Sequence, residues 1–111
     1  MKKILLTIDQ PPSEIVSEKL RMAVGLTMDD DNAISLLMIG AGVFNAVGVD
    51  EEAMGWHIDK HLSMLQMMKV GIYVDADSIT ARNINPVKFG VQTVTTDNRD
   101  SIIDDMDLII S

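Results

Sequence analysis

The 111-residue chain contains no cysteine. This absence excludes disulfide bonds, thiolate metal sites and a thiol nucleophile supplied by the chain itself. It also removes the usual indication of the redox compartment, which comes from cysteine usage. Any chemistry at this protein must therefore use hydroxyls, carboxylates, imidazoles or the sulfur of another molecule.

Positive charge and long hydrophobic runs are also scarce. Nine lysines and arginines stand against 17 aspartates and glutamates, and the formal net charge of −8 argues against nucleic acid as the main ligand. No segment approaches the ~20 continuous apolar residues that span a bilayer. The first apolar run covers residues 4–8 and is followed by Asp9. We therefore expect no signal peptide, no membrane anchor and a cytoplasmic protein.

The remaining composition, 47% hydrophobic and 23% charged, is typical of a folded protein, and the length predicts a single domain over residues 1–111. Short apolar runs alternate with amphipathic helical patterns, which predicts βαβ units. The predicted fold is a three-layer α/β/α variant of the flavodoxin-like arrangement, with a mostly parallel sheet of about five strands. The expected strands are 4–8, 33–39, 72–74, 91–94 and 108–110, and the expected helices are 13–24, 50–69, 79–82 and 101–106.

Two histidines four residues apart, His57 and His61, lie on the long expected helix, a spacing that can hold a divalent metal. No carboxylate shares their side of the helix, and Ile58 stands where a zincin motif requires glutamate. A place in the core or in a subunit contact therefore accounts for both histidines better than a metal site. The apolar arc beside them consists of Met54, Ile58, Leu62, Leu65 and Met68.

Gly40 and Gly42 follow the second expected strand, as the glycines of a dinucleotide-binding loop do. Asn45 stands where that fingerprint requires a third glycine, so the pattern indicates an ordinary turn. Ligands of open α/β sheets nevertheless bind at the carboxyl ends of the strands. We therefore expect this loop and the loop 75–78 to flank one crevice.

Asp75 and Asp77 end the third expected strand, and Ser78 follows them. Two carboxylates in such a loop can perform acid–base chemistry or bind a cation, whereas Ser78 can cap the following helical turn. Capping and solvation account for these residues without catalysis, and no second catalytic group accompanies Asp75. A structural role and a role as general base both remain open.

Several of these features together resemble the DsrE/DsrF (TusD/TusC) sulfur-relay family, and its DsrF/TusC branch in particular. Their order along the chain fits that family from end to end. The resemblance is carried by Gly42-Val43-Phe44, by Ile72-Tyr73-Val74-Asp75 with its continuation 76–84, and by the Asp-aliphatic terminal strand 107–111.

In catalytic members of that family, a cysteine that carries a persulfide follows the third strand, then small residues, then a helix with an arginine near its end. Ala76, Ser78 and Arg82 match this pattern, and Asp75 stands at the cysteine position. A carboxylate oxygen cannot form a persulfide. The resemblance therefore implies the fold and the oligomeric habit without the sulfur-carrying step, and we expect neither catalysis nor a cofactor.

Two hypotheses of function follow. In the first, the chain is a non-catalytic subunit that supports sulfur transfer by a cysteine-bearing partner, or a cysteine-less homo-oligomeric homologue. The family's habit implies a trimer or hexamer, built from this chain alone or with DsrE/DsrF-like paralogues, and the apolar face with His57, His61 and the methionines is the expected contact. In the second, the chain is a small-ligand or metal-binding α/β domain that uses the crevice near Gly42 and Asp75.

Overall fold

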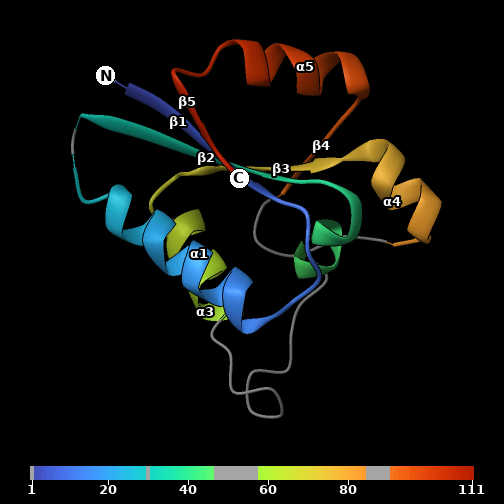
Figure 1. Ribbon diagram of the computed structural model, residues 1–111, viewed down its shortest axis with the longest axis horizontal. Helices are drawn as coiled ribbons and strands as arrows, with labels where there is room; N and C mark the ends of the chain where they lie inside the picture. Colours follow the sequence, from blue (N-terminus) through green and yellow to red (C-terminus); the bar gives the residue numbers. More distant parts are fainter. Residues whose placement is uncertain (1, 30, 47–57, 85–90) are drawn as a thin grey trace.

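All five expected strands are present and form one sheet in the computed structural model, which describes residues 2–29, 31–46, 58–84 and 91–111 (Figure 1). The spatial order of the strands is β4-β3-β2-β1-β5, and every neighbouring pair is parallel. The bounds are β1 (Lys2–Ile8), β2 (Asn32–Met38), β3 (Gly71–Asp75), β4 (Gln92–Val94) and β5 (Leu108–Ile110).

The helices form two outer layers. α1 (Glu14–Leu26) and α3 (Ile58–Met67) pack together on one face of the sheet, and α5 (Thr96–Asp104) covers the other face (Figure 1). A short 3₁₀ helix, η1 (Gly40–Ala46), follows β2, and α4 (Ala76–Arg82) follows β3. The three-layer α/β/α prediction is confirmed. None of the helices in the described part of the chain is long and apolar enough to cross a membrane.

The side chains of β1 alternate between two apolar layers, because successive residues of a strand point to opposite faces. Ile4, Leu6 and Ile8 pack into the larger core on the side of α1 and α3, whereas Leu5 packs into the smaller core on the side of α5. All four side chains are buried. Burial on both faces explains why this strand is a continuous apolar run in the sequence.

α1 begins as the sequence predicts. The Ser13 hydroxyl caps it by accepting a hydrogen bond from the backbone N–H of Val16 at 3.2 Å. The apolar residues spaced along its inner side are buried against the sheet and α3. They are Val16, Leu20, Ala23 and Val24, as expected.

The described part of the long helix, α3, buries Ile58, Leu62 and Leu65 completely, as the apolar arc predicts. Met68 departs from the expected arc, because it lies beyond the last helical residue and is 40% exposed. Lys69 follows with a φ of 62°, a left-handed conformation that turns the chain out of the helix toward β3. Met54 and His57 lie outside the described residues.

α5 starts five residues earlier than the expected helix 101–106 and ends before Met106. The Thr95 hydroxyl caps it by accepting from the N–H of Asn98 at 3.4 Å. Its first half is polar, and only Ile102 and Ile103 of the helix pack against the sheet. The apolar pattern therefore marked the packed end of the helix and missed the capped end.

The order of the strands reverses at β1. From β1 the chain moves outward through β2 and β3 to β4, then returns on the opposite face through α5 to place β5 on the other side of β1. Because all pairs are parallel, the carboxyl ends of the five strands meet at one edge of the sheet. The loops after these strands are therefore neighbours.

Gly42 lies where η1 crosses the end of β1. A Cβ added at Gly42 would lie 1.8 Å from the carbonyl oxygen of Ile8, so the backbone would have to move. We expect Gly42→Ala to lower the free energy of unfolding by about 2 kcal/mol or more, since overpacking a tight site costs this order of energy. Urea denaturation measures the change.

The matched control is Gly25→Ala in α1, where an added Cβ meets nothing within 4 Å. Alanine favours a helix over glycine by up to ~1 kcal/mol, so this variant should be as stable as the parent or more stable. Equal effects of the two substitutions would contradict the close approach of η1 to β1.

Candidate functional site

Asp75 is the last residue of β3 and the N-cap of α4. One of its carboxylate oxygens, Oδ2, accepts from the backbone N–H of Ser78 at 3.1 Å and from the Ser78 hydroxyl at 2.6 Å. The residue is only 3% exposed. The cap of α4 is thus the aspartate, and Ser78 is the residue whose N–H it binds.

The second oxygen of Asp75, Oδ1, accepts from Arg99, which reaches it from α5 at 3.2 Å. The Arg99 side chain is 29% exposed and the Asp75 side chain 4%, so the ion pair is largely shielded from water. Three donors occupy the carboxylate, which offers about four acceptor positions. Most of the acceptor capacity of Asp75 is therefore used within the fold.

Ser78 connects this cluster to the loop after β2. Its hydroxyl accepts from the backbone N–H of Gly40 at 2.9 Å while it donates to Asp75. Gly40 has a φ of +53°, a conformation that glycine adopts without strain. The expected loop 75–78 is the last residue of β3 and the first turn of α4. The structure therefore brings η1 and the start of α4 into direct contact through one hydroxyl group.

The other residues of the resemblance lie around this contact. Val43 is completely buried in the larger core, whereas Phe44 is 40% exposed. The Asp77 carboxylate is exposed and accepts from the Thr96 hydroxyl at 2.8 Å. Arg82 donates to the Ser78 carbonyl at 3.3 Å, at the far end of α4 from Asp75. Ala76 is the half-buried first residue of α4.

The proposed metal ligands give a separate result. His61 lies half-buried on α3, and His57 falls outside the described residues. Within residues 2–29, 31–46, 58–84 and 91–111, no group of three or more His, Cys, Asp or Glu side chains is placed to hold a metal ion.

Arg99 is the site residue that sequence reasoning missed. It lies 24 positions after Asp75 in a polar stretch of α5, and nothing in its neighbours distinguishes it from a solvated charge. Its role depends on the crossover that places α5 above the end of β3. The available signal was a basic residue in the helix that follows β4.

Together the parallel sheet and the polar cluster where β3 meets α4 define a three-layer α/β protein with its candidate site at the carboxyl edge of the strands. The model of the DsrE/DsrF-like family matches residues 1–107, and the chain belongs to this family.

Among solved structures, the crystal structure of the ychN protein from E. coli is similar, with a TM-score of 0.87 and 20% sequence identity over 99% of this chain and 98% of that one. At this identity the likeness establishes the shared fold alone. The search of curated proteins gives no match.

Replacing Asp75 tests whether its carboxylate holds the site together. We expect Asp75→Ala to lower the free energy of unfolding by about 2–4 kcal/mol, because it removes a helix cap and leaves Arg99 and Ser78 without their shared acceptor. Thermal or urea denaturation measures the loss.

Asp77→Ala is the matched control, since Asp77 is exposed, lies in the first turn of α4 and accepts a hydrogen bond from the Thr96 hydroxyl. Its removal should change stability by no more than about 0.5 kcal/mol. If both variants lost the same stability, the structural role of Asp75 would be contradicted.

Proposed function

We propose that this chain is a non-catalytic DsrE/DsrF-like subunit, close to the DsrF/TusC branch, that supports sulfur transfer by a cysteine-bearing partner in the cytoplasm. Membership of the family supports the pathway. The observation that carries the non-catalytic role is the state of Asp75, a buried carboxylate held by Ser78 and Arg99.

A sulfur relay needs a thiolate that accepts a sulfur atom and releases it again as a persulfide. This chain contains no cysteine, and the carboxylate of Asp75 cannot replace one in that chemistry. Its contacts with Arg99 and Ser78 keep the loop folded without any sulfur in place. The contribution of this subunit is therefore made through its surface, by binding and positioning a partner.

Exposed apolar side chains support such a contact. Phe44 is 40% exposed on η1, beside the start of α4 that Asp75 caps. Met67 and Met68 are 83% and 40% exposed at the end of α3 that leads into β3, toward the opposite edge of the sheet. A partner whose reactive cysteine lies near the carboxyl edge of the sheet would cover Phe44. We propose a hetero-oligomer with DsrE/DsrF-like paralogues, and a homo-oligomer of the same chain as the alternative assembly.

Transfer of radioactive sulfur tests the function directly. The chain is incubated with a cysteine desulfurase and ³⁵S-cysteine, alone and together with a cysteine-bearing DsrE-like protein from the same source. We expect no label on this chain, and faster labelling of the partner when the chain is present.

A partner variant with its cysteine replaced by serine serves as the control for labelling. If the two proteins neither associate nor change the rate of labelling, the hetero-complex is contradicted and the cysteine-less homo-oligomer takes its place.

Phe44→Ala tests the proposed contact edge. We expect this substitution to weaken association with the partner by about tenfold, since buried aromatic residues dominate many interfaces. Ile109→Ala is the matched control, because Ile109 is also apolar and 42% exposed but lies on the edge strand β5, which β1 and β2 separate from β3. Analytical ultracentrifugation compares the two, and a larger effect of Ile109→Ala would place the contact elsewhere.

A further inference from the structure

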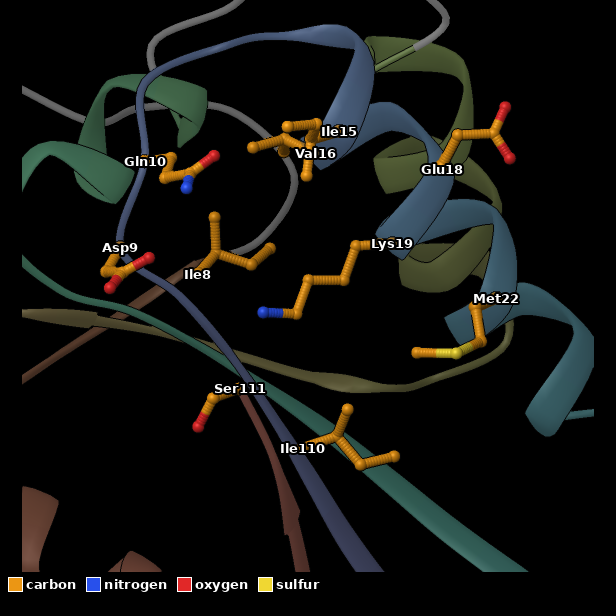
Figure 2. Close-up of a pocket in the computed structure, with 10 residues that line it drawn as sticks. All are labelled: Ile8, Asp9, Gln10, Ile15, Val16, Glu18, Lys19, Met22, Ile110 and Ser111. Carbon is orange, nitrogen blue, oxygen red and sulfur yellow. The ribbon is translucent and has the colours of Figure 1, made fainter.

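A pocket of about 390 Å³ opens between α1 and the carboxyl ends of β1 and β5 (Figure 2). Its walls are largely apolar and include Ile8, Val16, Met22 and Ile110. The volume falls within the range of roughly 300–1,000 Å³ that is usual for sites of small molecules. Asp75 lies at the end of β3, with β2 and β1 between it and β5, so this pocket is separate from the site described above.

Lys19 extends from α1 into this pocket, toward the ends of β1 and β5 (Figure 2). Its ammonium group donates to the backbone carbonyl of Thr7. Its two other N–H groups have no acceptor among the described residues. Partial burial lowers the pKa of Lys19, while the nearby Asp9 opposes the shift. The cation is therefore incompletely solvated and has donors available for a ligand.

The pocket lies beside the last two residues of β1. The last pair between the two strands is Leu6 with Ile110, so Thr7 and Ile8 of β1 extend beyond β5. In the recess that remains, Lys19 takes the Thr7 carbonyl in place of a backbone partner from β5. Lys19 thus lines a largely apolar recess, and its ammonium group lies beside the sheet.

The topology points to the same place independently. In open α/β sheets, ligands bind outside the carboxyl ends of the strands at the point where the strand order reverses. In this sheet the order reverses at β1, between β2 on one side and β5 on the other. The lining of the pocket includes Asp9 and Ser111, the residues that directly follow β1 and β5.

Three charged side chains line the pocket: Lys19 is the cation, and Asp9 and Glu18 are carboxylates. Glu18 points away from the lysine in Figure 2, and its side chain is 66% exposed. Asp9 is exposed at the rim and makes no ion pair with Lys19 in the described part of the chain. Both carboxylates are thus in contact with water, whereas the ammonium group lies beside the carboxyl end of β1, where it donates to Thr7.

We propose that this pocket binds a small carboxylate with a compact apolar body, and that Lys19 binds the carboxylate group. The apolar body packs against Ile8, Met22 and Ile110. The carboxylate accepts from the two N–H groups of Lys19 that Thr7 leaves available. This binding site is independent of the proposed role in sulfur transfer.

Three probes of the same shape test the proposal on the unaltered protein: benzoate, benzyl alcohol and benzylamine. Titration at pH 7 is followed by NMR of the isoleucine and methionine methyl groups. We expect benzoate to shift the methyl signals of Ile8, Ile110 and Met22, and to bind more tightly than the neutral alcohol and the cationic amine. Added salt should weaken the binding of benzoate and leave the affinity of benzyl alcohol unchanged.

Lys19→Met keeps the apolar stem and removes the charge, and it should weaken benzoate binding by about tenfold or more, because it removes both charge-assisted hydrogen bonds to the carboxylate. Lys2→Met, at the opposite end of β1, makes the same change in net charge and should leave the affinity within about twofold.

Three results would overturn the proposal: benzyl alcohol or benzylamine binding as tightly as benzoate, shifts confined to methyl groups outside the pocket, or equal effects of the two lysine substitutions. The first two are read on the parent protein and do not depend on the folding of a variant.

Discussion

The carboxylate of Asp75 is the interaction on which the carboxyl edge of the sheet depends. It ends β3, caps α4, and pairs with Arg99 of α5, so one side chain joins a strand and two helices. Through the Ser78 hydroxyl it also fixes the loop after β2. An aspartate held in this way is part of the framework of the site, and this agrees with a chain that lacks cysteine and keeps the fold of its family.

The strands and the first helix could be predicted because their signals are local. β1 and β2 are buried on both faces and are continuous apolar runs, and Ser13 followed by Val16 and Leu20 marks a capped amphipathic helix. The start of α5 could not be found in the same way, since its first half is polar and its cap is a single threonine.

Contacts between distant residues were beyond local patterns. The adjacency of segments 40–46 and 75–78 follows from parallel strands. The hydroxyl that joins them belongs to Ser78, which was a candidate site residue in the sequence. The pair of Asp75 with Arg99, and the position of Lys19 beside the end of β1, depend on where α5 and β5 return to the sheet. The reversal of strand order at β1 therefore separates two regions of one edge: a filled polar cluster at β3 and an open pocket at β5.

A double-mutant cycle measures whether Asp75 stabilises the structure through its contact with Arg99. The free energies of unfolding of the parent, Asp75→Asn, Arg99→Gln and the double variant are measured by urea denaturation under one condition. We expect a coupling energy of about 1 kcal/mol or more between the two side chains, because each substitution removes the same contact. Additive effects of the two substitutions would contradict this role of the ion pair and leave Asp75 with its cap of α4 alone.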